Sequence, residues 1–346
     1  MKEQAPGTLM SAEMAEQPQV LNRLATRYAD IAGRIRSALA GTGRPAGVAF
    51  LARGSSDNAA LLGRYAVELR TGVPTCLIAP SVLTAYGRTP TGFHGWVVLA
   101  LSQSGRTPEI IDSAQRLRRA GATIIAITND ASSELAAAAD LAVALDAGPE
   151  RAVPATKTVT AQLLGILAVV AGIGDGPELV GELDRLADRA AEVLADTASV
   201  DSAATMLARH RRLAVVARGL LYPAAKETAL KLQETTGAMA HGFSTADFRH
   251  GPIAVCGPDA PAVLLAGSGP ADHDTRELVS VLRERGADSI VAGSAASDPV
   301  RWPVADGATD CLLATIRGQQ LALAVCRELG IDPDHPLGLN KVTLTH

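Results

Sequence analysis

Leu99-Ala-Leu-Ser-Gln-Ser-Gly-Arg-Thr107 is the stretch on which the expected fold depends. The residues at 96–101 are all apolar, some of them β-branched, and predict a buried strand of a parallel sheet. Pro108 suits the first position of a helix and Glu109 favours its positive end, so a helix is predicted to continue towards Arg119. Three hydroxyls, an amide and a glycine therefore lie where a strand gives way to a helix.

This strand-to-helix turn has the chemistry of an anion site. Backbone N–H groups are free at a helix N-terminus, and the helix dipole there favours negative charge. Ser102, Gln103, Ser104 and Thr107 would therefore suit a phosphate. A polar turn with a simple Ser or Thr cap would read the same way, and the segment alone leaves both interpretations open.

The bulk composition indicates a two-domain protein with aliphatic cores. The chain has 346 residues, of which 47% are hydrophobic, 20% charged and only 3% aromatic, which is typical of helix-covered sheets. A net charge of -4 without any basic run argues against nucleic acid as a partner. The four cysteines, Cys76, Cys256, Cys311 and Cys326, lie far apart and predict buried thiols in a reducing compartment.

The sequence shows no targeting or membrane signal. Acidic residues at Glu3, Glu13 and Glu16 argue against a signal peptide, and the apolar run at 161–173 is too short for a membrane span. We therefore expect a soluble, cytoplasmic protein. Because no metal-ligand cluster or nucleotide fingerprint is visible, no cofactor is inferred.

The first half alternates predicted strands and helices. Helical periodicity extends from Met10 to about Leu39. Strands are predicted at 47–52, 74–79, 96–101, 123–128 and 141–145, with helices through Leu69 and to Ala120 between them. This alternation predicts a parallel sheet with helices on both faces.

The second half repeats that alternation. An irregular loop at 150–157 leads into an apolar helix at 158–173, then a glycine-rich linker and two helical stretches, to about 198 and at 202–210. Strands are predicted at 213–217, 262–266, 289–292 and 311–314, and helices at 223–236, 275–285 and 318–329. A strand, an Arg-Gly pair and a helix occur at both 50–58 and 215–223, which indicates a duplicated unit.

The expected architecture is α/β, with two tandem domains that each hold a mainly parallel sheet flanked by helices on both faces. The expected divisions are an N-terminal helical segment at 1–40, a first domain at 41–175, a linker helix at 176–198, and a second domain at 199–346.

Two further segments of the first half could join the serine-rich turn. Ser55 and Ser56 follow the first strand and would face the same crevice, because ligands bind outside the carboxyl ends of parallel strands. Ser56 or Asp57 could instead simply cap the next helix. Val153-Pro-Ala-Thr-Lys157 would close a third side, although Lys157 could equally be a solvated surface lysine.

The second half offers a carboxylate pair, a histidine and a lysine. Glu227, Lys231 and Glu234 fall on one helical face, and the periodicity alone favours a surface salt-bridge ladder. His250 lies in a turn punctuated by Gly and Pro, where it could bond to backbone or move protons near neutral pH. Lys341 lies in a β-prone tail, where a lysine is usually just solvated.

Taken in order, these motifs resemble the sugar isomerase (SIS) domain family. They are Ser-Gln-Ser-Gly, Val-x-x-Thr-Lys, Ala229-Leu-Lys-Leu-Gln-Glu-Thr235, Arg249-His-Gly-Pro252 and a C-terminal Leu-x-Lys. The chain resembles the isomerase half of glutamine–fructose-6-phosphate aminotransferases. It resembles stand-alone glucosamine-6-phosphate deaminases more closely, through Arg53-Gly-Ser-Ser-Asp-Asn-Ala59 and the ending Lys341-Val-Thr-x-Thr345. The resemblance extends from about Met10 to the end.

The resemblance implies two SIS domains and a homodimer with active sites near the subunit interface. It implies a set of substrate- and phosphate-binding residues: Ser55, Ser56, Ser102, Gln103, Ser104, Thr107, Val153, Ala155, Lys157 and Lys231. Glu234 would be the base that moves a proton between C1 and C2, and His250, from the neighbouring subunit, would assist ring opening. Lys341 would cover the open-chain sugar as the tail closes the site. The phosphate would supply orientation for proton abstraction next to a carbonyl or imine.

Some features depart from the family pattern and leave the reaction open. His241 stands where family members have a glutamate, and Pro154 replaces a common alanine. No glutaminase domain or N-terminal nucleophilic cysteine is seen, so we expect that glutamine is not the nitrogen source.

Three functions follow from these observations. The first is an enzyme of the glucosamine 6-phosphate deaminase/isomerase type. The second is a dehydratase (a lyase) that removes the C2 proton and the C3 hydroxyl of N-acetylglucosamine 6-phosphate. The third is a non-catalytic sugar-phosphate sensor, although no helix-turn-helix segment or basic face is evident.

Overall fold

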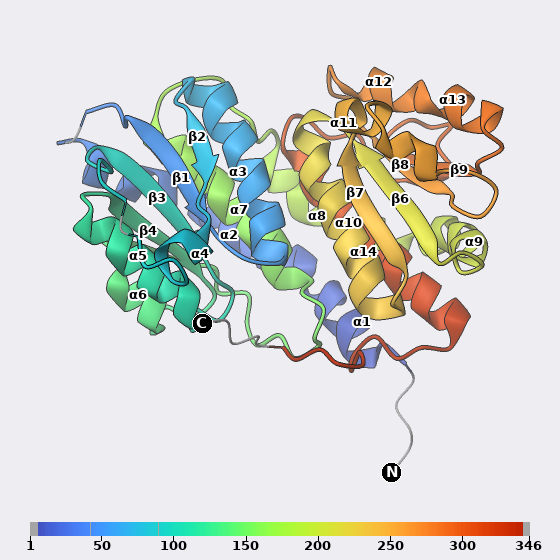
Figure 1. The fold of residues 1–346 in the computed structure, drawn as a ribbon, viewed down its shortest axis with the longest axis horizontal. Coiled ribbons are helices and arrows are strands. Elements are labelled where there is room, and N and C mark those ends of the chain that lie inside the picture. The colour runs from blue at the N-terminus through green and yellow to red at the C-terminus, as the bar shows by residue number, and fades with distance from the viewer. Residues whose placement is uncertain (1–5, 42, 89, 342–346) are drawn as a thin grey trace, which may run out of the picture. The chain divides into compact units, whose positions relative to one another are not determined.

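A computed structural model describes residues 6–41, 43–88 and 90–341 (Figure 1). Contacts within the chain define two compact units, each built around one sheet. The first-sheet unit contains residues 20–150 and 158–179, and the second-sheet unit contains residues 6–19, 151–157 and 180–341. The N-terminal helix and the 151–157 loop thus pack with the second sheet, whereas the predicted domain boundaries were drawn along the sequence and remain a prediction.

The first sheet is fully parallel, as predicted. Its strand order is β2 (Thr75–Leu77), β1 (Gly47–Leu51), β3 (Trp96–Leu101), β4 (Thr123–Thr128) and β5 (Leu141–Ala144). The chain passes from β1 to β2 on one side and from β3 through β4 to β5 on the other. Such an order has its topological switch point between β1 and β3.

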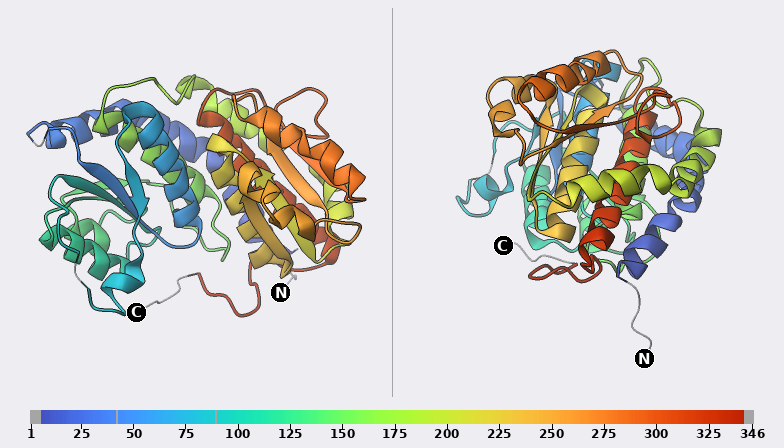
Figure 2. Two further views of the ribbon diagram at one scale, coloured as in Figure 1. Left: turned by 45° about the horizontal axis from the view of Figure 1, so that its top comes forward. Right: turned by 90° about the vertical axis from the view of Figure 1, so that its right-hand side faces the viewer.

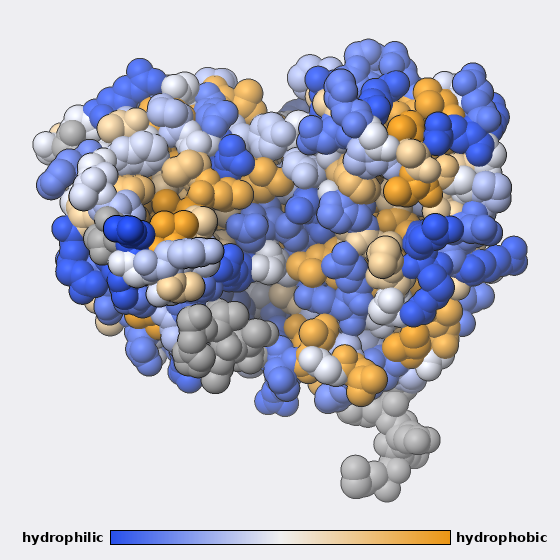
Figure 3. Space-filling view, viewed as in Figure 1, coloured by the Kyte–Doolittle hydropathy of each residue, from blue (hydrophilic) through white to orange (hydrophobic). Residues whose placement is uncertain are grey.

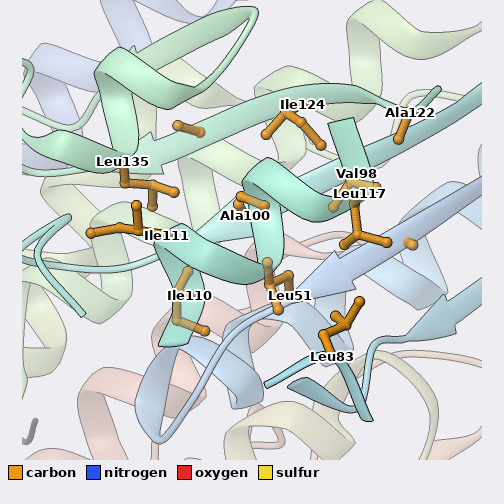
Figure 4. Packing of buried hydrophobic residues seen from close by; sticks show 13 residues of the cluster. Leu51, Leu83, Val98, Ala100, Ile110, Ile111, Leu117, Ala122, Ile124 and Leu135 are labelled. Carbon is orange, nitrogen blue, oxygen red and sulfur yellow. The ribbon is translucent and has the colours of Figure 1, made fainter. Parts of the chain in front are cut away.

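Helices cover both faces of this sheet (Figures 1 and 2). They are α2 (Gln17–Leu39), α3 (Ser55–Thr71), α4 (Pro80–Leu83), α5 (Pro108–Arg119), α6 (Glu134–Ala138) and α7 (Lys157–Ile173). On one face Leu51, Val98 and Ile124 pack against Ile110 and Leu117 of α5 (Figure 4). Because the opposite face is covered as well, the strands are apolar on both sides, which explains why they read as continuous apolar runs.

The second sheet repeats this topology. Its order is β10 (Val300–Arg301), β9 (Ser289–Gly293), β8 (Ala262–Ala266), β6 (Arg212–Ala217) and β7 (Met239–Ser244), all parallel. Numbered within its own half, the order matches that of the first sheet, so the predicted duplication is confirmed. The second switch point lies between β6 and β8.

The helical elements of the second-sheet unit include three short 3-10 turns. They are α1 (Thr8–Ala15), η1 (Leu183–Arg185), α8 (Leu186–Ala195), α9 (Ala198–Leu207), η2 (Gly219–Leu221), α10 (Tyr222–Thr236), α11 (Thr245–Arg249), η3 (Pro252–Val255), α12 (Asp272–Arg276), α13 (Leu278–Glu284) and α14 (Thr309–Leu329). The single helix predicted from Met10 to Leu39 is therefore two helices, with a break at Glu16.

One predicted strand is wrong, and two strands went unpredicted. Cys311–Ala314 belongs to α14, which is buried along most of its length, so its apolar run lacks the periodicity that distinguishes a helix from a strand. β7 was missed because its sequence, Met-Ala-His-Gly-Phe-Ser, has no β-branched residue. β10 has only two residues.

The cysteines are free thiols, as predicted. Cys256, Cys311 and Cys326 are buried and Cys76 is half-buried. Burial raises the pKa of Cys311 to about 12 and that of Cys326 to about 11, so both stay protonated and unreactive near neutral pH.

The surface mixes hydrophilic side chains with smaller apolar patches on the face drawn in Figure 3. Within the described residues, every helix is too short or too polar to cross a membrane.

Candidate functional site

The first switch point brings the two predicted polar strand ends to one edge of the first sheet. β1 and β3 are neighbours, with Leu51 paired to Ala100 in the register. Arg53 and Ser102 each follow two residues later, so the loops that carry Ser55 and Ser56, and the residues 102–107, leave adjacent strands at the same level. We call residues 102–107 the serine loop. Ligands bind at this position in doubly wound sheets.

The hydroxyls of the serine loop shape the turn itself. Ser102 Oγ accepts a hydrogen bond from the Gly105 N–H at 3.1 Å, and Ser104 Oγ accepts one from the Arg106 N–H at 3.2 Å. The Ser102 and Thr107 hydroxyls lie 3.3 Å apart. The hydroxyls therefore hold the loop in a compact ring at the start of α5.

Three amides of the same loop remain available. The backbone N–H groups of Gln103, Ser104 and Thr107 donate no hydrogen bond to any residue that the structure describes. The Thr107 side chain makes no cap hydrogen bond at the start of α5, so the interpretation of this turn as a simple Ser or Thr cap is wrong. The N-cap residue of α3 is Gly54 rather than Ser56 or Asp57. Open amides at a helix N-terminus are the kind of donors that suit an anion.

The turn after β4 supports the serine loop. Gly105 has φ +63°, and a Cβ at this position would lie 2.1 Å from Ser133 Oγ, so only glycine fits. The Asn129 N–H donates to the Gln103 carbonyl at 3.1 Å, and the Leu135 N–H donates to the Gly105 carbonyl at 3.0 Å. These hydrogen bonds hold the loop through the carbonyl groups of Gln103 and Gly105 and leave its three open amides unused.

The carboxylates on α10 are buried, contrary to the surface ladder that periodicity favoured. Lys231 is fully buried, and its Nζ lies 3.4 Å from Glu227 Oε1 and 2.5 Å from Glu234 Oε2. The Glu227 side chain is 2% exposed and that of Glu234 is 23% exposed. Glu234 is therefore the member of this group that a ligand can reach.

The surroundings of Glu234 suit a proton carrier. Burial raises the pKa of its carboxyl above the ordinary value, and the charge of Glu227 adds to this. Lys231 and, more weakly, Lys341 lower the pKa in part, so Lys341 lies near enough to act on Glu234. A carboxyl with a raised pKa beside cations is typical of an acid–base site. The predicted ending beyond Lys341 lies outside the described residues.

The Val-x-x-Thr-Lys loop is anchored within the second-sheet unit. Lys157 is fully buried with its Nζ 2.6 Å from Glu16 Oε2, so its interpretation as a solvated surface lysine is wrong. The Ala152 N–H donates to Glu13 Oε2 at 3.2 Å, and the Val153 N–H donates to the Asp334 carbonyl at 3.4 Å. Val153 and Ala155 are half-buried at its centre.

The two histidines of interest are both exposed. The His250 ring makes no hydrogen bond, ion pair or ring contact within the described part of the chain. His241 packs against Phe243 with the rings tilted by 46° and their centroids 4.4 Å apart. Partial burial and the charge of Lys226 hold the pKa of His241 below its ordinary value, so this imidazole is neutral near pH 7.

One ion pair at the first switch point was missed at the sequence level. Arg53 binds the buried carboxylate of Glu109 through two hydrogen bonds. The signal was available: the Arg-Gly pair recurs at Arg218, which forms an ion pair with Asp274 in the second half. The sequence shows the repeated arginines but not their partners.

A possible cation cluster is already neutralised. His273, Asp274 and Glu277 have potential ligand atoms within 4.8 Å of one another. Arg218 binds Asp274 and Arg249 lies 3.4 Å from Glu277, so positive charge is already present beside this exposed group.

The chain resembles known proteins over most of its length. A family model described as SIS domain matches residues 46–171 and 206–301. A glutamine–fructose-6-phosphate aminotransferase of Methanothermobacter thermautotrophicus is 31% identical over 96% of this chain and 56% of its own. One from Pseudomonas aeruginosa is 31% identical over 85% of this chain and 51% of its own. The chain thus spans about half the length of these relatives.

Solved structures give the same picture of the fold. A protein described as a "putative phosphosugar isomerase" from Silicibacter pomeroyi DSS-3 has a TM-score of 0.82 and 29% identity, covering 94% of this chain and 100% of its own. Glucosamine-6-phosphate deaminase from Thermotoga maritima has a TM-score of 0.72 and 20% identity, covering 96% of this chain and 99% of its own. At that identity the likeness shows the fold alone.

Proposed function

The chain belongs to the SIS domain family, and from this premise we propose that it is an enzyme that acts on an amino-sugar 6-phosphate. In this proposal the serine loop binds the 6-phosphate, and Glu234 removes the proton from C2 of the open-chain sugar. The enzyme works as a cytoplasmic homodimer, in which His250 of one subunit assists ring opening at the neighbouring site. Lys341 covers the open-chain sugar.

The observation that carries the proposal is the environment of Glu234. Its carboxyl is partly accessible, its pKa is raised by burial, and Lys231 lies 2.5 Å from it. A base with a pKa nearer to neutrality takes and returns a proton more readily than an ordinary surface carboxylate. The open amides and the hydroxyls of the serine loop support the phosphate part of the proposal.

The default outcome is deamination with isomerisation. Glu234 takes the C2 proton of the open-chain aldose and returns it to C1, while one proton passes from the C2 nitrogen to O1, so the C1 carbonyl becomes a hydroxyl and C2 becomes an imine. Water then adds to the imine carbon and ammonia leaves, giving fructose 6-phosphate. The phosphate anchor supplies the orientation that both proton transfers need.

A dehydratase is the second candidate, and His241 favours it. The family's usual glutamate is absent at that position, and the neutral imidazole there carries no negative charge to hold an ammonium group. With an N-acetylated sugar the nitrogen cannot leave as ammonia. The electron pair left at C2 would then expel the C3 hydroxyl, which departs as water.

Product analysis tests these candidates. Purified protein is incubated in D₂O with glucosamine 6-phosphate or N-acetylglucosamine 6-phosphate, and the products are analysed by mass spectrometry. Ammonia with fructose 6-phosphate identifies the deaminase, and an unsaturated N-acetyl product identifies the dehydratase. Ligand binding without product, and without deuterium at C2, would identify a sensor and contradict the proposed enzyme.

The variant Glu234→Gln tests the base. We expect turnover and deuterium incorporation to fall about a hundredfold to ten-thousandfold, the usual contribution of a positioned base. Glu328→Gln is the matched control, because it makes the same change at an exposed carboxylate of α14 and should leave the rate unchanged. Wild-type turnover in Glu234→Gln would remove Glu234 from the mechanism.

A further inference from the structure

Arg53 lies at the first switch point next to the serine loop. It follows β1 at the level at which Ser102 follows β3, and its side chain is 49% exposed. The Nε and Nη2 groups of Arg53 donate to Glu109 Oε2 and Oε1, each at 3.0 Å. The Nη1 group makes no hydrogen bond within the described residues. Part of the guanidinium therefore remains available to a ligand.

Glu109 places a negative charge where a phosphate would bind. It lies in the first turn of α5, immediately after the serine loop, and its side chain is only 6% exposed. A carboxylate in this turn is favourable for the helix, but unpaired it would repel a phosphate at the same N-terminus. The forked contact with Arg53 offsets this charge at the place where the proposed phosphate site needs it offset.

The second half repeats the ion pair away from the serine loop. Arg218 follows β6 as Arg53 follows β1, and it pairs with Asp274 of α12. The ion pair by itself is therefore part of the duplicated scaffold. The neighbourhood of Arg53 differs, because the serine loop beside it has three open amides.

We propose that Arg53 is a binding residue for the sugar phosphate. It neutralises Glu109 and gives its remaining N–H groups to an oxygen of the 6-phosphate. This inference rests on the proposed function, since it needs a phosphate in the serine loop. Lysine cannot replace this arginine fully, because an ammonium group does not form the forked contact.

Calorimetric titration with inorganic phosphate and with glucosamine 6-phosphate tests the role of Arg53. We expect Arg53→Gln to weaken both by about tenfold to a hundredfold, the range for a lost charge-assisted contact. Glu109→Gln should bind phosphate as tightly as wild type or a few-fold more tightly. The double variant should regain part of the loss, because the repelling carboxylate is gone.

Arg218→Gln is the matched control, and it should bind both ligands with wild-type affinity. The inference is overturned if Arg53→Gln binds as wild type does, or if Arg218→Gln loses as much affinity as Arg53→Gln. Where Arg53→Gln does not fold, Arg53→Lys decides: affinity between that of wild type and a tenfold loss supports the role, and unchanged affinity contradicts it. If wild type binds neither ligand, the proposed function itself fails, whatever the variants do.

Discussion

The two switch points have the same strand topology, but the backbone N–H groups of their loops differ in whether the protein itself supplies a hydrogen-bond acceptor. At the first, the amides of Gln103, Ser104 and Thr107 remain open within the described residues. At the second, after β8, the Ser268 N–H donates to Asp310 Oδ2 at 3.1 Å and the Gly269 N–H donates to Asp272 Oδ2 at 2.7 Å. Both aspartates are at least nine-tenths buried.

The protein's own carboxylates thus fill the second switch point. Asp272 and Asp310 take the backbone donors that an anion would need, and Trp302 Nε1 donates to Asp310 at 2.6 Å. A duplicated fold offers two possible anion sites, and here the carboxylates of Asp272 and Asp310 take the place of an anion at the second. The comparison teaches that strand topology locates a possible site, whereas the residues on the following loop decide whether a ligand can use it.

Adding one methyl group to each loop gives the largest expected effect. In Gly105→Ala the backbone is strained at φ +63°, and the new Cβ meets Ser133 Oγ at 2.1 Å. The serine loop must move, so we expect inorganic phosphate and glucosamine 6-phosphate to bind on the order of a thousandfold more weakly, as if about two charge-assisted hydrogen bonds were lost. Calorimetric titration measures this loss.

Gly267→Ala is the corresponding change at the second switch point. Its Cβ would lie 1.8 Å from Asp310 Oδ2, so the variant should lose thermal stability but keep wild-type affinity for phosphate. If Gly267→Ala weakens phosphate binding as much as Gly105→Ala does, the second loop also belongs to the binding site and the proposed difference between the two switch points is wrong.

Asp310→Asn tests the filled switch point through pH. Burial, with the charges of Asp272 and Asp306, raises the pKa of Asp310 from 3.8 to about 6. The folded state therefore holds this proton more tightly than the unfolded state, and stability falls as pH rises from about 4 to 6. At about 1.4 kcal/mol per pKa unit, the fall is roughly 3 kcal/mol. The variant should lose most of this slope in urea unfolding measured between pH 4 and 8.

The exposed Asp288 provides a control for this slope. Asp288→Asn makes the same chemical change at an exposed carboxylate and should leave the slope as in wild type. Asp272 contributes in the same direction, because burial raises its pKa too, so some slope remains in Asp310→Asn. An unchanged slope in Asp310→Asn would show that Asp310 is already ionised at pH 4.

The sequence was sufficient to predict the five strands of the first sheet and three of the five strands of the second. Strands such as β3 and β4 are buried on both faces, so each appears as an apolar run that ends at a polar turn. Polar residues that follow two neighbouring parallel strands must lie at the same edge of the sheet, so the loops of Ser55 and Ser102 were expected at one edge, and the register of β1 with β3 agrees. The sequence pattern is informative here because each apolar run coincides with a strand that the sheet buries on both faces.

The remaining features depend on contacts between distant segments. Nothing near Lys157 in the sequence shows that its ammonium group will be buried or that Glu16, far away in the chain, will form an ion pair with it. The ladder on α10 reads as a surface feature because periodicity gives the spacing of charges but not what covers them. One of the two carboxylates that fill the second switch point, that of Asp310 on α14, lies 42 residues beyond Ser268. Such pairings are not encoded in any local pattern.

Trp302→Phe gives the smallest expected effect and identifies the group responsible for the pH slope. The indole N–H stabilises the ionised form of Asp310 and so lowers its pKa. Without this donor the pKa of Asp310 rises further, by about one unit for one lost hydrogen bond to a charged group. The decline in stability should therefore extend about one pH unit higher than in wild type, in the same urea experiment.

Trp96→Phe separates this electrostatic effect from lost packing. Trp96 packs against Phe93 in the first-sheet unit, whereas both aspartates belong to the second-sheet unit, so its replacement should lower stability equally at every pH. If Trp302→Phe also shifts the whole curve without moving its upper end, the indole serves only packing. The Trp302 hydrogen bond would then play no part in keeping the second switch point filled, and the contrast between the two loops would rest on the two aspartates and the backbone alone.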